Sequence, residues 1–132
     1  MKLVIGGYAQ GKLRYVIQEN GEAGCMVYDA SLPDDTQQKA AAEGGRILVI
    51  DHLHRWIREM LTAGKEPEQI LLSFLHENRD CIVICDEIGN GIVPINPLER
   101  EYRERTGRIL IEIAKQADEV VRVICGIGQK IK

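Results

Sequence analysis

The segment from Gly6 to Lys12 reads GGYAQGK and has the GxxxxGK spacing of a phosphate-binding loop. An apolar run precedes it and an amphipathic stretch follows it, which predicts a strand, a turn and a helix. Glycines let backbone amides face a phosphate, and a lysine at the helix start neutralises its charge. We expect a nucleotide phosphate to be bound by Gly6, Gly7, Tyr8, Ala9, Gln10, Gly11, Lys12 and Leu13.

Leu13 departs from the motif, which calls for a serine or threonine after the lysine. The hydroxyl of that residue binds the magnesium ion of the nucleotide, and a leucine has none. The sequence therefore favours phosphate binding over magnesium-dependent chemistry. Taken alone, the segment also fits an ordinary glycine-rich turn between a strand and a helix.

Two further apolar runs end in acidic residues: ILVID ends at Asp51, and CIVICDE ends at Asp86 and Glu87. A parallel sheet binds ligands at the carboxyl ends of its strands, where phosphate-loop proteins keep a magnesium-orienting carboxylate. We expect catalytic roles for Lys12, Asp51 and Glu87, with Asp51 as the candidate metal ligand. Helix caps or solvated loop residues are the alternative interpretation of these carboxylates.

Two histidines follow the first of these acidic strand ends, at positions 52 and 54. A histidine beside a phosphate site could accept a nucleotidyl group or move a proton, although helix-packing histidines are commoner. Trp56 could stack on a base, and burial against the sheet is its commoner role.

Short apolar runs alternate with amphipathic segments along the whole chain, which is typical of strand–helix units around a parallel sheet. Most of the runs are almost continuously apolar, as expected of strands covered on both faces. We predict an α/β fold, a phosphate-loop NTPase-like three-layer sandwich with a mainly parallel sheet of about five strands. The runs lie at 3–5, 25–28, 47–50, 81–85 and 120–125.

Helices are expected over 52–63, from Pro67 onward, and from Asn96 to about Ala117. Asn96 is the expected cap of the last of these, with Glu99 in a capping-box-like position.

Two local features are less regular. A short helix over 33–43 could follow a Ser31 cap. Gly107 lies inside the last helix and costs it about 1 kcal/mol relative to alanine, which predicts a close contact or a bend.

The composition indicates one globular domain over residues 1–132, with 45% hydrophobic and 28% charged residues. The formal net charge is −3, and basic residues alternate with acidic ones, which argues against nucleic acid as a partner. No apolar run approaches the roughly 20 residues of a membrane span, and the first strand leaves no room for a signal peptide. We therefore expect a cytoplasmic protein.

Four cysteines stand at 25, 81, 85 and 125, and three of them lie within Val/Ile-rich segments such as CIVIC and VICG. We expect buried thiols that pack as small hydrophobic groups. Cys81 and Cys85 would lie about 13 Å apart on one strand, too far to share a metal ion.

The segment DEIGNGIVPINPLEREYRERTGRILIEIAKQADEVVRVICGIGQKIK resembles the C-terminal part of the adenosylcobinamide kinase/adenosylcobinamide-phosphate guanylyltransferase family, with its NEVGxGIVP loop, RxxRDxxG helix and ADEVxxVxxG strand. GGYAQGK is similar to that family's GGxxSGKS, and VIDHLHRWI to its LIDCLTLWL. The resemblance covers about three-quarters of the chain, and its GIVP block is more specific than a phosphate-loop pattern. Matching positions are Gly89, Gly91, Ile92, Val93, Pro94, Gly107, Ala117, Asp118, Glu119, Val120 and Gly126.

Members of this family phosphorylate the aminopropanol hydroxyl of adenosylcobinamide and then attach GMP through a guanylylated histidine. The resemblance implies GTP or ATP and Mg²⁺ as cofactors, a corrinoid small molecule as partner, and a homo-oligomer. It also implies that Asp51 and Glu87 lie beside the metal or nucleotide. The substrate site would be shaped by the loop of Gly89, Gly91, Ile92, Val93 and Pro94.

The chain also departs from the family pattern. Gln10 and Leu13 replace the two serines of the phosphate loop, and Leu110 and Ile111 replace an Asn-Gln pair. Residues 14–46 contain no histidine, so the segment that carries the family's guanylyl acceptor is missing. Two functions remain open: a nucleotide-dependent transferase, or a non-catalytic nucleotide- or phosphate-binding protein that acts on a partner.

Overall fold

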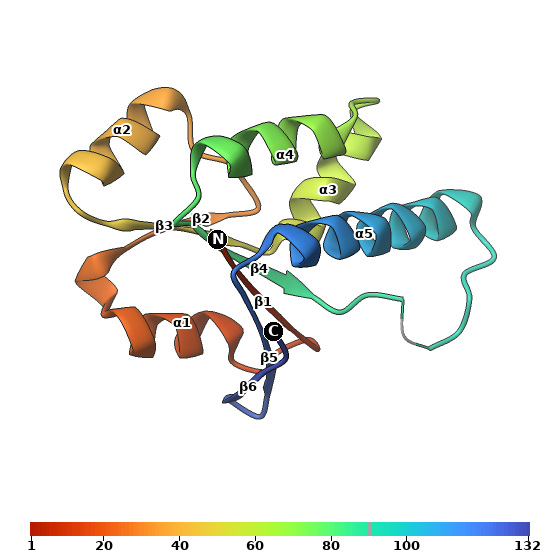
Figure 1. Cartoon of the computed structure of the whole chain (residues 1–132). Helices are drawn as coiled ribbons and strands as arrows, with labels where there is room; N and C mark the ends of the chain where they lie inside the picture. The colour runs from red at the N-terminus through yellow and green to blue at the C-terminus, as the bar shows by residue number, and fades with distance from the viewer. Residues whose placement is uncertain (90) are drawn as a thin grey trace.

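The computed structural model describes residues 1–89 and 91–132 and contains a sheet with helices on both faces (Figure 1). The strand order is β2-β3-β4-β1-β5-β6, and all neighbouring strands are parallel except β5 and β6. This arrangement confirms the predicted phosphate-loop-like α/β fold. The strands are β1 (Lys2–Gly6), β2 (Cys25–Asp29), β3 (Ile47–Asp51), β4 (Ile82–Asp86), β5 (Glu119–Ile124) and β6 (Ile127–Lys130).

The helices occur where the sequence pattern predicts them, within a few residues at each end. In Figure 1, α1 lies on one side of the sheet, and α3, α4 and α5 lie on the other. None of the described helices is both long and apolar enough to span a bilayer. The helices are α1 (Lys12–Asn20), α2 (Asp35–Glu43), α3 (Leu53–Thr62), α4 (Pro67–Glu77) and α5 (Pro97–Gln116), with a 3₁₀ turn at Glu22–Gly24.

The core has two parts, one on each face of the sheet, because neighbouring strand residues point to opposite faces. Leu3 packs with the side chains of α2, α3, α4 and α5, whereas Val4 packs on the other face with Val16 of α1. This two-sided burial explains the nearly continuous apolar runs. Each fully buried side chain of this kind contributes about 1.5–3 kcal/mol.

The sixth strand is a difference from the prediction of about five. β6 returns antiparallel to β5 through a turn at Cys125 and Gly126, whose φ angles are +51° and +77°. Two positive φ angles are those of a type I′ hairpin turn. The usual sequence signal for that turn is Asn-Gly. Here the turn residues are Cys-Gly, so the sequence pattern does not predict the hairpin.

Two predicted helix caps differ from the structure. Asp34, not Ser31, caps α2: its side chain accepts the Gln37 N–H, and the Gln37 side chain accepts the Asp34 N–H. Asn96 caps α5 as predicted, by accepting the Leu98 N–H at 2.9 Å. Glu99 does not complete the capping box at Asn96 and instead pairs with Arg58 of α3.

Gly107 makes no close contact, because a Cβ built there would have nothing within 4 Å. That part of the prediction is wrong. The prediction of buried thiols is confirmed for Cys81 and Cys85, and Cys25 is buried as well. It is wrong for Cys125, which is exposed. Burial raises the pKa of Cys85 to about 12, which keeps this thiol protonated.

Candidate functional site

The loop between β1 and α1 lies at the carboxyl end of the strand β1, between β4 and β5. Gly11, at φ +85°, precedes the first residue of α1, and Ala9 also has a positive φ of 53°. Among the described residues, the N–H groups of residues 8–13 donate to no protein acceptor. Further along α1, the Tyr15 N–H donates to the Gly11 carbonyl oxygen. Unpaired amides at a helix N-terminus form a site for an anion.

The β5–β6 hairpin supports this loop from the side. The carbonyl oxygen of Gln10 accepts the Gly126 N–H at 2.8 Å, and its side-chain oxygen accepts the Cys125 N–H at 2.7 Å. Gly6 is equally constrained, because a Cβ there would lie 2.5 Å from the Val123 carbonyl oxygen. Gln10, which replaces a serine of the family motif, therefore supports the backbone of the loop.

Lys12 is buried, and its amine already has two partners. Its Nζ donates to the Gly7 carbonyl oxygen at 2.6 Å and lies 2.7 Å from the Asp86 carboxylate. A buried charge is tolerated only when it is paired in this way. An ammonium group has three N–H donors, so Lys12 can donate the third to a phosphate oxygen in the loop, where the phosphate shares the Lys12 charge with Asp86.

Asp86 connects Lys12 to His54 of α3. The Asp86 N–H donates to His54 Nδ1 at 3.2 Å, so the ring proton is on Nε2, which lies 3.5 Å from the Asp86 carboxylate. Burial lowers the pKa of His54, and the Asp86 charge opposes this shift. Lys12, Asp86 and His54 thus form one connected group under the loop.

The sequence identifies Asp86 as a strand-end residue but predicts a catalytic role for its neighbour, Glu87. The parallel register sets Asp86 beside Gly6, at the base of the loop. A register between β1 and β4 is the signal that identifies it, because the two strands are far apart in the chain.

Glu87, the other acidic residue after β4, pairs with Arg122 of β5 and not with Lys12. Its two carboxylate oxygens lie 2.8 and 3.0 Å from the Arg122 guanidinium on β5. This paired geometry engages both oxygens of Glu87. The described contacts therefore join Glu87 to β5 and not to Lys12 or Asp51.

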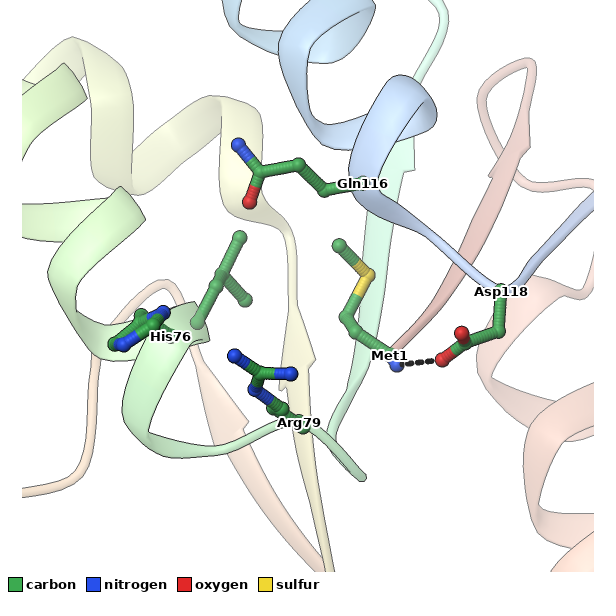
Figure 2. A pocket seen from close by; sticks show the side chains of 6 residues that line it. Met1, His76, Arg79, Gln116 and Asp118 are labelled. Atoms are coloured by element: carbon green, nitrogen blue, oxygen red, sulfur yellow. Dashed lines mark hydrogen bonds and ion pairs between the residues drawn. The ribbon is translucent and has the colours of Figure 1, made fainter.

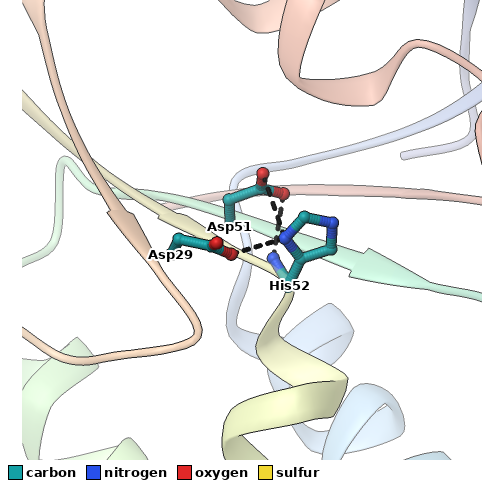
Figure 3. Close-up of side chains that lie close together, drawn as sticks. All are labelled: Asp29, Asp51 and His52. Atoms are coloured by element: carbon teal, nitrogen blue, oxygen red, sulfur yellow. Dashed lines mark hydrogen bonds and ion pairs between the residues drawn. The ribbon is translucent and has the colours of Figure 1, made fainter.

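Asp51 lies in a second cluster, at the carboxyl ends of β2 and β3 (Figure 3). His52 Nδ1 lies 2.5 Å from Asp29 Oδ1 and 3.4 Å from Asp51 Oδ2. Asp51 Oδ1 accepts the His52 N–H at 2.8 Å. Desolvation by burial raises the pKa of Asp51. The three side chains offer ligand atoms within 4.8 Å of one another, which a metal ion could share.

Sequence reasoning missed Asp29. It ends the apolar run CMVYD just as Asp51 ends ILVID, and the β2–β3 register places the two residues opposite each other. The same strand-end signal that identified Asp51 was available for Asp29.

The predicted substrate loop, Gly89 to Pro94, connects β4 to α5, and Asn90 in it lies outside the described residues. Ile92 is 92% exposed, and its carbonyl oxygen accepts a hydrogen bond from Arg103 of α5 at 2.7 Å. A cavity of about 460 Å³ adjoins the start of the loop. It is lined by His54, Arg55, Arg58, Asp86, Glu87, Ile88, Gly89, Glu99, Tyr102 and Arg103.

A smaller cavity, of about 270 Å³, lies at the opposite edge of the sheet (Figure 2). There the Met1 ammonium group pairs with Asp118 at 2.6 Å, and Arg79 and Gln116 face the same space. None of the predicted site residues lines it. The predicted site residues therefore lie away from this cavity.

Comparison with known proteins gives a consistent result. A stretch of 51 residues is 47% identical to the bifunctional adenosylcobalamin biosynthesis protein CobU of Salmonella typhimurium, covering 39% of this chain and 28% of that protein. The equivalent Escherichia coli protein is 43% identical over 51 residues, again 28% of its length. The bifunctional adenosylcobalamin biosynthesis protein CobP of Pseudomonas aeruginosa is 29% identical over 101 residues, covering 71% of this chain and 58% of that protein.

In each alignment the chain spans less than two-thirds of the relative's length. Residues 28–131 match the family described as "Cobinamide kinase / cobinamide phosphate guanyltransferase". This match includes both acidic strand ends and the loop before α5, and it begins after the phosphate loop. Because it covers well over half of the 132 residues, the chain belongs to the cobinamide kinase / cobinamide phosphate guanyltransferase family.

Proposed function

We propose that the chain binds GTP or ATP at the loop Gly6–Leu13 and transfers a phosphoryl group to the hydroxyl of a corrinoid of the cobinamide type. One observation carries the proposal: the N–H groups of residues 8–13 meet no acceptor in the described part of the chain, and they lie at the N-terminus of α1 with the Lys12 amine beside them. Amides and an ammonium group arranged in this way stabilise the charge of a transferred phosphoryl group.

In the proposed reaction the substrate hydroxyl oxygen bonds to the γ-phosphorus while the bond to the β–γ bridging oxygen breaks. The Lys12 amine donates its third hydrogen to a phosphate oxygen, and the proton of the substrate hydroxyl passes to the carboxylate of Asp86, which His54 contacts. Glu87 contributes through Arg122, by fixing the chain where the 89–94 loop begins.

Magnesium is expected with the nucleotide, and it would neutralise phosphate charge. Leu13 cannot supply the usual hydroxyl ligand, so Asp51 at the end of β3 is the proposed protein ligand. The cavity beside the start of the 89–94 loop is the proposed entry for the corrinoid.

A non-catalytic nucleotide- or phosphate-binding subunit is the second candidate, and specific contacts favour it. Lys12 is already paired with Asp86, and Glu87 with Arg122, while Leu13 has no hydroxyl. Such a protein would bind the nucleotide without turnover and act on a partner. In either case we expect a homo-oligomer, to be measured by light scattering.

Calorimetry with GTP and with ATP, each with and without Mg²⁺, tests binding. Lys12→Ala should weaken it by about one to three kcal/mol, the loss of a charge-assisted hydrogen bond. Lys65→Ala is the matched control, because Lys65 is an exposed lysine in the turn between α3 and α4. An equal effect of the two substitutions would rule out the loop as the phosphate site.

Incubation of the chain with nucleotide and adenosylcobinamide, followed by mass analysis of the corrinoid, separates the two candidates. A mass increase of one phosphate supports the kinase. Nucleotide binding without any corrinoid product would discard the kinase and leave the binding subunit.

A further inference from the structure

We infer that Asp29, Asp51 and His52 form a site for a divalent transition-metal ion of the Zn²⁺ or Co²⁺ type, at the carboxyl ends of β2 and β3 (Figure 3). Their ligand atoms lie within 4.8 Å of one another. Nitrogen and oxygen ligands bound at about 2.1 Å in a tetrahedral site stand about 3.4 Å apart. The Nδ1 of His52 is already 3.4 Å from Asp51 Oδ2.

Metal binding requires a change in one distance, that between Asp29 Oδ1 and His52 Nδ1. Asp29 Oδ1 lies 2.5 Å from His52 Nδ1, and a metal between them requires it to move out by about 1 Å. The Asp29 side chain is 67% exposed, so its carboxylate is free to rotate. The other two ligand residues need no such movement.

The buried carboxylate of Asp51 gives independent support for a cation. The Asp51 side chain is only 9% exposed, and its Oδ1 is satisfied by the His52 N–H. Its Oδ2 lies 3.4 Å from His52 Nδ1, whose single hydrogen is directed at Asp29. The carboxylates of Asp29 and Asp51 therefore share one imidazole, and a bound cation would offset the negative charge that the imidazole leaves unpaired.

The backbone holds these ligands in place before a metal arrives. The parallel register of β2 and β3 sets Asp29 opposite Asp51. His52 follows directly, with a φ of +52° at the N-terminus of α3, which turns its ring back over the strand ends. The site therefore rests on two strands and a helix start, as a pre-organised metal site does.

The imidazole ligand decides the class of metal. Magnesium prefers oxygen ligands in octahedral geometry, whereas imidazole suits zinc, cobalt and nickel. The site shares Asp51 with the proposed nucleotide site, but its binding requires no nucleotide. The test is therefore made with metal alone, so that failure of either proposal leaves the other intact.

The experiment titrates chelator-treated protein with Zn²⁺ against a chromophoric chelator, and with Co²⁺ by visible absorption. Cys125→Ser serves as the background, since this exposed thiol could bind either metal. We expect one ion per chain, a Co²⁺ spectrum without thiolate charge-transfer bands, and far weaker binding of Mg²⁺. Failure of Zn²⁺ to bind at 100-fold excess, or binding that is lost in the Cys125→Ser background, would overturn the inference.

Two substitutions locate the site. Asp29→Asn removes an exposed ligand, and His52→Asn removes the imidazole while keeping a residue that accepts positive φ. Each should weaken Zn²⁺ binding by at least about 10- to 100-fold. Asp35→Asn and His76→Asn, at exposed positions on other helices, are the matched controls. Circular dichroism confirms folding, and unchanged affinity in both site variants would place the metal elsewhere.

Discussion

The two halves of the carboxyl edge differ in how their charges are balanced. Around the phosphate loop, Lys12 pairs with Asp86, and Glu87 pairs with Arg122. Around the ends of β2 and β3, the two carboxylates of Asp29 and Asp51 face one imidazole, that of His52. The first half is neutralised from within the protein, whereas the second has more negative charge than its partner can satisfy.

This difference has a consequence for binding. An anion that enters the loop meets a Lys12 charge that the Asp86 carboxylate already balances, so the attraction between the anion and Lys12 is weakened. A cation at the ends of β2 and β3 replaces only the hydrogen bond between His52 and Asp29, and it offsets the charge of two carboxylates. We therefore expect the nucleotide to bind less tightly than its loop geometry alone suggests, and the metal ion to bind without rearrangement of the strands.

The largest effect is expected from Gly6→Ala, a substitution at the base of the loop between β1 and α1. The new Cβ would lie 2.5 Å from the Val123 carbonyl oxygen, and backbone atoms of β1 or β5 must move. Urea denaturation should show a loss of about 3 kcal/mol in unfolding free energy. Gly107→Ala is the control, because its Cβ meets nothing and should stabilise α5 by about 1 kcal/mol. A loss below 1 kcal/mol at Gly6 would contradict the tight packing of β1 against β5.

Asp86→Ala should cost about 2–3 kcal/mol of stability, because it leaves the buried Lys12 amine with only the Gly7 carbonyl as partner. Glu87→Ala removes a more exposed pair and should cost less than about 1 kcal/mol. Urea midpoints of the two variants measure the difference. Equal losses would show that the buried Lys12–Asp86 pair and the more exposed Arg122–Glu87 pair contribute alike to stability.

Asp86→Asn keeps the shape of the side chain and removes its charge, so it tests the competition for Lys12. Magnesium-free GTP should bind about tenfold more tightly, since the phosphate no longer shares the Lys12 charge with a carboxylate. Calorimetry on the variant measures this change, with Asp80→Asn, an exposed aspartate before β4, as the control. Weaker binding to Asp86→Asn would mean that the carboxylate helps the phosphate instead of competing with it.

The sequence alone predicted the parts of this edge that depend on local pattern. Apolar runs and caps located the strands and helices, and the glycine spacing located the loop before Lys12. The sequence predicts Asp51 as a site residue because it ends an apolar run. Its role as a metal ligand, like the nucleotide role of the loop, stays a prediction.

What the sequence could not predict depends on which strands are neighbours. The Lys12–Asp86 pair requires β1 beside β4, and the Asp29–His52 contact requires β2 beside β3. No local pattern contains that information, because the paired residues are separated by long stretches of chain. The same limit explains why the sequence predicts Glu87, and not Asp86, as a catalytic residue. Adjacent residues at a strand end point in different directions, and the strand register is needed to show which of them lies beside the loop.

The smallest predicted effect concerns the hairpin that supports the loop. Cys125 holds a φ of +51°, a conformation that is strained for most residues other than glycine and asparagine. Cys125→Asn creates the Asn-Gly pair that type I′ turns prefer and keeps the N–H that donates to Gln10, so it should raise stability by about 0.5 kcal/mol. Cys125→Val, with a β-branched side chain, should lower it by about 1 kcal/mol. Urea denaturation of both variants measures the contrast. If the two variants are equally stable, then the backbone angle at this turn does not limit the hairpin, and the support of the phosphate loop must come from the Gln10 contacts alone.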